Sequence, residues 1–211
     1  VPVKDLFTYF MFAELIQEMR ERNFANLDEL SQLWNEDYSN RKVFSQFLKD
    51  KALGEKRLTS MPDRITNTIN LTDGSQIKRP SVINAYRESS LPSIEIWWRE
   101  WKKFMFATYV QIFSNGHGEA SPQLVCDLIG PINREKYPAL SAEEQAISVP
   151  LQILCLAIMD TIFVHVANRV APTAWERIRQ TLCRAFIHNK IDRICNILAS
   201  SYRDQHVIFL Q

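Results

Sequence analysis

Glycine is scarce in this chain, and neither sign of charge is in excess. Only 5 of the 211 residues are glycine, whereas glycine-rich phosphate loops and the tight turns of all-β folds would need more. The 25 Lys and Arg residues balance 24 Asp and Glu residues, for a net charge of +1. No overall field therefore attracts nucleic acid or an acidic membrane. Any such surface must be local, and residues 56–120 and 173–211 are the mildly basic segments.

Motifs for metal binding and for common catalytic chemistry are also missing. The four cysteines have no C-x-x-C spacing, and the four histidines form no H-x-x-x-H or H-E-x-x-H pattern. We therefore expect neither a metal nor another cofactor. The chain contains no G-x-x-x-x-G-K-[ST] phosphate loop and no G-x-S-x-G nucleophile elbow. We interpret the cysteines as reduced, buried thiols of an intracellular protein, in the cytoplasm or the nucleus.

Apolar residues are plentiful, and their spacing is mostly helical. They make up 46% of the chain and include 12 Phe, 6 Tyr and 5 Trp, which is enough for one hydrophobic core at this length. The spacing predicts an all-α fold with several helices in a single domain over residues 1–211. The predicted helices are 5–22, one from Asn26, one through Val43 and Leu48 to Gly54, one from Ser93 through Ile112, a short one from Ser121-Pro122, 151–171, one from the capping box Thr173–Glu176 to a break near His188-Asn189, and one from Ile191 to Tyr202.

One segment departs from this helical pattern. Between residues 64 and 79, apolar Ile65, Ile69 and Leu71 alternate with polar residues before a Thr72-Asp73-Gly74 turn. Alternation of this kind beside a glycine turn predicts a short β-hairpin. If the chain has two lobes, we expect the seam between them at residues 61–92.

The segment from Leu151 to Ala171 is almost entirely apolar and is long enough to cross a bilayer. The sequence disfavours a membrane span, because Asp160, His165 and Arg169 would be costly in lipid. A central helix surrounded by other helices is the better interpretation. Asp160 then needs a partner, and we expect it to hold a neighbouring helix through an arginine or a backbone amide. In the alternative interpretation, an enzyme with dispersed catalytic residues, Asp160 and His165 are the candidates.

Basic residues on helices near aromatic side chains are the candidates for contact with RNA. Phosphate groups are neutralised by Lys and Arg on one surface, often beside rings on which bases stack. The alternative is that these residues are ordinary charged side chains on solvent-exposed helix faces. The candidate residues are Arg99, Lys102, Lys103, Arg177, Arg184, His188, Lys190 and Arg193.

Both ends of the sequence are apolar, which favours a protein with partners. Residues 1–12 and 204–211 either pack back on the domain, as in a monomer, or are arms that lie in a groove of a neighbouring molecule, which is the interpretation favoured here. The partner-binding candidates on them are Phe7, Phe10, Val207 and Phe209. The predicted function is therefore a non-enzymatic binding and assembly protein that associates with itself or with protein partners, with RNA contact through the basic faces. The alternative is an adaptor domain that binds a partner's peptide or helix in an apolar groove.

Overall fold

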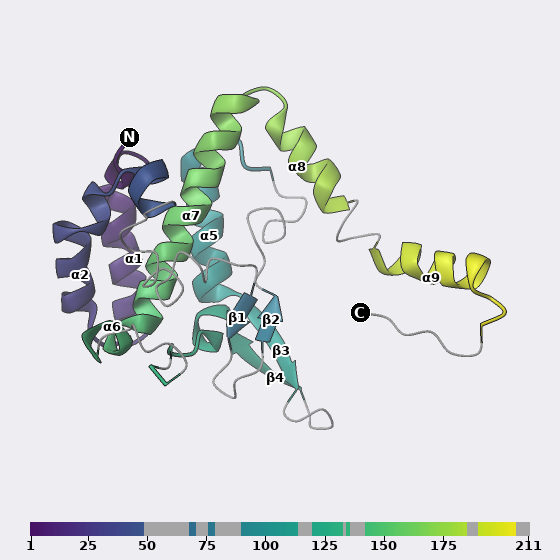
Figure 1. Cartoon of the computed structure of the whole chain (residues 1–211), viewed down its shortest axis with the longest axis horizontal. Helices are drawn as coiled ribbons and strands as arrows, with labels where there is room; N and C mark the ends of the chain where they lie inside the picture. Colours follow the sequence, from purple (N-terminus) through teal and green to yellow (C-terminus); the bar gives the residue numbers. More distant parts are fainter. Residues whose placement is uncertain are drawn as a thin grey trace.

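The computed structural model describes residues 1–48, 68–70, 76–78, 90–113, 120–132, 134–135, 142–184 and 190–205. The protein is mostly helical, as predicted. The elements, labelled in Figure 1, follow in the order η1 (Val3–Asp5), α1 (Tyr9–Glu21), α2 (Leu27–Glu36), η2 (Tyr38–Asn40), η3 (Val43–Phe47), β1 (Thr68–Asn70), β2 (Gln76–Lys78), α5 (Ile94–Ala107), β3 (Tyr109–Phe113), β4 (Ala120–Leu124), η5 (Val125–Leu128), α6 (Ala142–Ala146), α7 (Ser148–Val170), α8 (Trp175–Cys183) and α9 (Lys190–Ser201).

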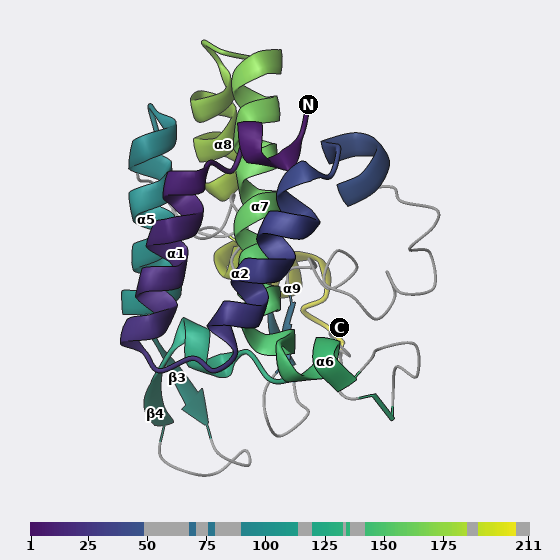
Figure 2. The ribbon, with the colours of Figure 1, turned by 90° about the vertical axis from the view of Figure 1, so that its left-hand side faces the viewer.

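Helices α1, α2, α5 and α7 surround the core. Figure 2 shows α1 and α2 side by side in front of α7, with α5 beside α1. The apolar stripe of each helix faces this centre, and one continuous cluster of buried side chains runs from Val3 to Trp175. The predicted helix at 5–22 is confirmed over Tyr9–Glu21, where Thr8 Oγ1 accepts a hydrogen bond from the Met11 amide at 3.3 Å.

The helix predicted from Asn26 is confirmed as α2, but Asn26 does not cap it through its side chain. Asn23 and Asn26 have φ of 57° and 61°, a left-handed conformation that asparagine tolerates and that turns the chain between α1 and α2. The Asn26 side-chain amide donates instead to the Ala146 carbonyl at 2.8 Å. Asn26 therefore ties the α1–α2 corner to the end of α6.

The N-terminal residues are not an arm, which corrects the prediction for residues 1–12. The Val3 amide donates to the Arg41 carbonyl at 2.9 Å, and the Val43 amide donates to the Val1 carbonyl at 3.1 Å. Phe7 is fully buried, with edge-on contacts to the Trp34 and Trp98 rings. Burying the Phe7 ring in the protein's own core is favourable without a partner.

The segment around Val43 forms a single π-helical turn, η3. The predicted helix there is thus confirmed only as one short turn, and Gly54, its predicted end, lies outside the described residues. Phe47 is buried in the core, whereas Phe44 on the same turn is exposed.

Helix α5 starts as predicted, because Ser93 Oγ accepts a hydrogen bond from the Ile96 amide at 3.3 Å. Its tryptophans Trp97, Trp98 and Trp101 are buried in the core. The prediction that this helix continues through Ile112 was wrong, because α5 ends at Ala107 and β3 follows.

A second antiparallel pair, β3 with β4, replaces two predicted helical stretches. Val110 pairs with Gln123, and Gln111 pairs with Pro122. The Ser121-Pro122 dipeptide, predicted to start a helix, lies in β4 instead. Proline is tolerated there because both strands of a two-stranded ribbon are edge strands. The β-branched and aromatic residues of Tyr109–Phe113 favour a strand once it has a partner.

The predicted β-hairpin at 64–79 is confirmed. Strands β1 and β2 are antiparallel, with Ile69 opposite Ile77 and Asn70 opposite Gln76. The predicted turn at Thr72-Asp73-Gly74 and most of the predicted seam at 61–92 lie outside the described residues. At the end of that segment Leu91 is buried, and its amide donates to Glu176 Oε1 at 3.0 Å.

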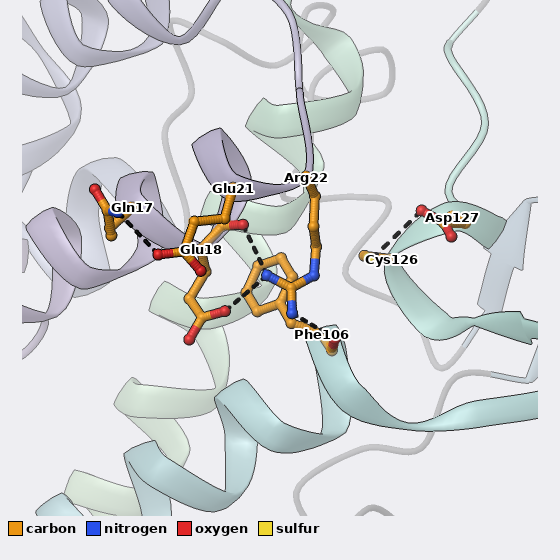
Figure 3. A network of polar contacts seen from close by, with 7 residues as sticks. All are labelled: Gln17, Glu18, Glu21, Arg22, Phe106, Cys126 and Asp127. Carbon is orange, nitrogen blue, oxygen red and sulfur yellow. Dashed lines mark hydrogen bonds and ion pairs between the residues drawn. The ribbon is translucent and has the colours of Figure 1, made fainter.

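Arg22 joins the C-terminal ends of α1 and α5, as Figure 3 shows. Its Nη2 donates to the Phe106 carbonyl at 2.7 Å, and its Nη1 donates to Glu18 Oε2 at 2.8 Å. The guanidinium carbon also lies 5.0 Å from the centre of the Phe106 ring. Carbonyls in the last turn of a helix have no partner within the helix, so Arg22 satisfies one of them.

Helix α7 is the long apolar helix predicted for 151–171, and it begins at Ser148, three residues earlier. Pro150 fits in its first turn, where no helical hydrogen bond is needed from the backbone nitrogen. The helix is long and apolar enough to cross a membrane, and 72% of its most hydrophobic window is buried inside the protein. This degree of burial is typical of a central core helix.

Helix α8 does not use the predicted Thr173–Glu176 capping box. The residue preceding the helix is Ala174, and no side chain caps it. Glu176 instead accepts from the Leu91 amide and lies 3.3 Å from buried Arg179. The predicted break near His188-Asn189 falls outside the described residues, and α9 follows it as predicted. Figure 1 shows α9 far from α1 and α2, at the opposite side of the molecule.

Candidate functional site

An apolar groove of about 540 Å³ lies between the C-terminal half of α7, η3 and the first residues of the chain. Its apolar lining comes from Val1, Leu6, Val43, Phe44, Ile162, Val166 and Val170, and its polar lining from His165, Asn168 and Arg169. On α7 the apolar residues recur every four positions, so one helix face forms a wall of the groove. This groove is the candidate functional site.

Several of the apolar side chains that line the groove are exposed to solvent. Val170 is 78% exposed, Phe44 68%, Val1 68% and Val166 39%, whereas Ile162 beneath them is buried. Single exposed apolar residues are common on protein surfaces, but a contiguous patch indicates an interaction site. The groove therefore has an apolar floor and walls, with nothing from the described part of the chain covering them.

The polar residues lie among this apolar lining on α7. His165 is half-buried, and its Nε2 lies 3.3 Å from the Leu6 carbonyl. This contact fixes the N-terminal segment against α7. Arg169 is exposed, and Asn168 is half-buried. A few polar groups around an apolar surface orient a bound partner without supplying most of the affinity.

Asp160 has a structural role that the sequence only partly predicted. It is 3% exposed, and its Oδ2 accepts a hydrogen bond from the Trp101 indole nitrogen at 2.9 Å. It therefore holds the neighbouring helix α5, as expected, through a hydrogen bond from the Trp101 indole. His165 is five residues further along α7, about 140° around the helix axis. This arrangement does not pair Asp160 with His165 for acid–base chemistry.

The basic candidates on α5 are partly engaged with acidic neighbours. Lys102 lies 3.2 Å from Glu14 and 5.8 Å from the centre of the Trp98 ring. Arg99 lies 3.7 Å from Glu100, and Lys103 is exposed. Only part of this set is therefore available to phosphate groups.

The remaining basic candidates belong to α8, α9 and the segment between them. Arg177, Arg184 and Arg193 are exposed, whereas His188 and the side chain of Lys190 lie outside the described part of the structure. Figure 1 shows α9 well separated from α5. The structure thus places the predicted RNA-contacting residues on separate helices.

The four partner-binding candidates are divided between the core, the surface and the end of the chain that lies outside the described residues. The expectation for Phe7 was wrong, because its ring is completely buried among Trp34 and Trp98. Phe10 is 80% exposed near the start of α1. Val207 and Phe209, with most of the predicted arm 204–211, lie outside the described residues.

The described thiols are free, and two of them are in unreactive surroundings. Cys126 and Cys155 are buried, and burial raises the pKa of each thiol to about 12. Tyr38 beside Cys155 is also buried, which raises its pKa well above the usual value. Cys195 is exposed on α9, which corrects the prediction of a buried thiol at this position. Among the residues that the structure describes, no group of three or more His, Cys, Asp or Glu side chains could hold a metal ion.

Sequence reasoning missed the groove because its walls are far apart along the chain. Val1, Phe44 and Val170 come together only when the N-terminal segment pairs with the residues before η3 and both pack on α7. The one sequence signal was the apolar N-terminus, which was interpreted as an arm. The residues do mark a surface for apolar contact, but they help to form a groove instead of inserting into one.

The fold and the groove define a mostly helical protein with an exposed apolar surface. Residues 1–180 match a family described as a domain of unknown function, DUF8234, and the chain belongs to this family. The matched region contains the whole groove and ends within α8, before α9. Searches of curated proteins and of solved structures each found no match.

Proposed function

We propose that this protein is a non-enzymatic binding and assembly protein whose groove holds the apolar face of a helix from another protein molecule. The observation that carries the proposal is the exposure of Val170, Phe44, Val1 and Val166 around one groove. Burying these side chains against a partner removes apolar surface from water, at about 25 cal/mol per Å². Self-assembly and the adaptor function both use such a groove, and they differ only in its occupant.

The dimensions of the groove suit a helix better than an extended peptide. The α7 wall runs from Ile162 to Val170, roughly 12 Å at 1.5 Å per residue, or about two helical turns. Amphipathic helices bind such grooves with apolar side chains at positions i, i+3, i+4 and i+7. The described two-stranded ribbons β1–β2 and β3–β4 do not line the groove.

The proposal is non-enzymatic because of the positions of the two candidate catalytic residues, Asp160 and His165. Asp160 is buried and bound to Trp101, whereas His165 contacts the Leu6 carbonyl. Proton transfer requires groups within reach of one substrate, and these two residues point around different sides of α7. The free thiols favour an intracellular location, cytoplasm or nucleus, as part of the same proposal.

The test uses a fluorescent 15-residue peptide with leucine at positions i, i+3, i+4 and i+7, and Ala, Glu and Lys elsewhere. We expect the wild-type protein to raise its fluorescence polarisation in a saturable way. Val170→Lys should weaken this binding at least about tenfold, since it places a charge in the apolar wall. Val170 is 78% exposed at the end of α7, and a cation is compatible with a helix C-terminus. Folding should therefore survive.

The matched control is Phe10→Gln, a change of an equally exposed apolar residue outside the groove lining. It should leave peptide binding unchanged. Binding that is lost in Phe10→Gln and retained in Val170→Lys would place the interaction surface on α1 and contradict the proposal.

A second candidate function, contact with RNA, has one specific observation in its favour. Arg177, Thr181 and Arg184 are exposed and recur at intervals of four and three along α8, so they share one face. Among the described residues, neither arginine forms an ion pair with an acidic side chain. We expect RNA affinity to fall as the salt concentration rises. The double change Arg177→Gln and Arg184→Gln should reduce the slope of log affinity against log salt concentration by the equivalent of about one to two phosphate contacts. A slope that the double change leaves intact would remove this function.

A further inference from the structure

We infer that the helix held by the groove is α9 of a second copy of this chain. The inference rests on the proposed function, because it names the occupant of the same groove. Its evidence is a second apolar surface without a cover, located on α9. The same chain thus contains both the groove and an amphipathic helix that could occupy the groove of another copy.

Helix α9 is amphipathic, and its apolar side is exposed. Ile194, Ile197 and Tyr202 are 36%, 53% and 49% exposed, and Leu198 is half-buried. A helix of 12 residues is marginally stable in water by itself, so helices of this length normally depend on packing against other elements. The exposed isoleucines indicate that the part of the chain that the structure describes does not cover the apolar side of α9.

The apolar residues of α9 match what the groove can accept. Ile194, Ile197 and Leu198 have the spacing i, i+3, i+4, and Tyr202 extends the same face. This face covers about two turns, the same length as the α7 wall from Ile162 to Val170. The groove offers valine, isoleucine and phenylalanine surfaces to these side chains, so both sides of the contact are apolar.

The position of α9 favours a second copy over the chain's own groove. Figure 1 shows the N-terminal segment and η3, which form one side of the groove, on the side of α7 remote from α9. Helix α8 descends from the end of α7 on the other side and leads the chain towards α9. Each molecule therefore presents its groove and its α9 in different directions. Such unlike surfaces join copies head to tail, or as a reciprocal pair when each copy supplies one α9.

The experiment uses two full-length variants that damage opposite sides of the proposed contact. Val170→Lys damages the groove and keeps α9, whereas Ile197→Lys damages α9 and keeps the groove. Both residues are exposed, and circular dichroism should confirm that each variant folds. Light scattering after size exclusion then reports the molar mass, starting from 24.6 kDa for one chain.

We expect the wild-type protein to exceed the monomer mass with rising concentration, and each variant alone to remain a monomer. An equimolar mixture should form a pair of about twice the monomer mass, because the intact groove of one variant accepts the intact α9 of the other. The matched control is Asn196→Lys, which adds the same charge on the opposite, polar side of α9. It should assemble like the wild type.

The other outcomes separate this inference from the proposed function. If the mixture stays monomeric, or if Val170→Lys alone assembles like the wild type through contact between two α9 helices, α9 does not enter the groove of another copy. If the wild type is monomeric at all concentrations but still binds the leucine peptide, the groove functions with a different partner. Both outcomes overturn the inference, and only failure of the leucine peptide to bind overturns the proposed function.

Discussion

Replacing Trp101 by phenylalanine tests how the central helix α7 is attached to α5. Trp101 is 1% exposed and donates to Asp160 Oδ2 at 2.9 Å. Losing the smaller part of the indole leaves a cavity of roughly 40 Å³, which costs about 1 kcal/mol. Losing the hydrogen bond to a buried carboxyl group costs about 1–3 kcal/mol more. We expect the free energy of unfolding to fall by about 2–4 kcal/mol.

Trp97 on the same helix provides a matched control. It is completely buried, and its indole nitrogen has no hydrogen-bond partner among the described residues. Trp97→Phe removes the same atoms without breaking a hydrogen bond, so it should cost about 1 kcal/mol or less. The assay is urea denaturation followed by circular dichroism, in which the midpoint shifts and the slope stays constant. Equal losses for the two variants would refute a stabilising role for the Trp101–Asp160 bond.

Three further predictions concern the thiols and the helix ends. At pH 8 a thiol reagent should label Cys195 rapidly and leave Cys126 and Cys155 unlabelled in the folded protein, because burial raises the pKa of these two thiols to about 12. Equal labelling of all three thiols in mass spectrometry would contradict this prediction. Arg22→Gln should lower the free energy of unfolding by about 1–2 kcal/mol, because it removes the bonds to Glu18 and to the Phe106 carbonyl. This range allows for the partial exposure of the Arg22–Glu18 pair. An unchanged urea midpoint would show that the link is dispensable. Ser93→Ala should cost about 1 kcal/mol at the start of α5, whereas Ser93→Asp should keep the cap; the two variants would be equally stable if the cap were unimportant.

Local sequence patterns were sufficient for the main helices and for one hairpin. The apolar stripes of α1, α2 and α5 and the continuous apolar run of α7 are features of neighbouring residues, so periodicity finds them. The β1–β2 hairpin was found by the same means, because Ile69 and Ile77 flank the sequence Thr72-Asp73-Gly74, which is typical of a turn. The caps at Thr8 and Ser93 are local too, and Ser93 was predicted correctly.

The errors arose where distant contacts decide the local structure. Tyr109–Phe113 fits a helical pattern by itself, but pairing with Ala120–Leu124 makes it a strand. Glu176 was predicted to cap α8, but the amide of Leu91, 85 residues away in sequence, binds its side chain. Phe7 appeared to be an arm residue because nothing nearby in the sequence shows that Trp34 and Trp98 enclose it.

The candidate site was the least predictable part. A groove exists where an apolar surface stays uncovered, and a local sequence pattern does not show which surfaces other parts of the chain cover. Val166 and Val170 continue the apolar pattern of a buried helix, and the sequence alone gives no reason for them to be exposed. The structure shows that one apolar side of the C-terminal end of α7 is exposed, next to η3 and the first residues of the chain. That geometry leaves an apolar surface of a core helix exposed, which is the surface that the proposed function uses.

The most direct test of the groove as a binding site is a methyl NMR titration of the full-length protein with the leucine peptide. Methyl signals report a change of environment residue by residue, so the titration locates the contact on the protein surface. The proposed function predicts saturable shifts concentrated at Ile162, Val166 and Val170, with the methyl groups of Val125 in the distant core unchanged. Shifts that avoid the groove, or no shifts at millimolar peptide, would contradict it.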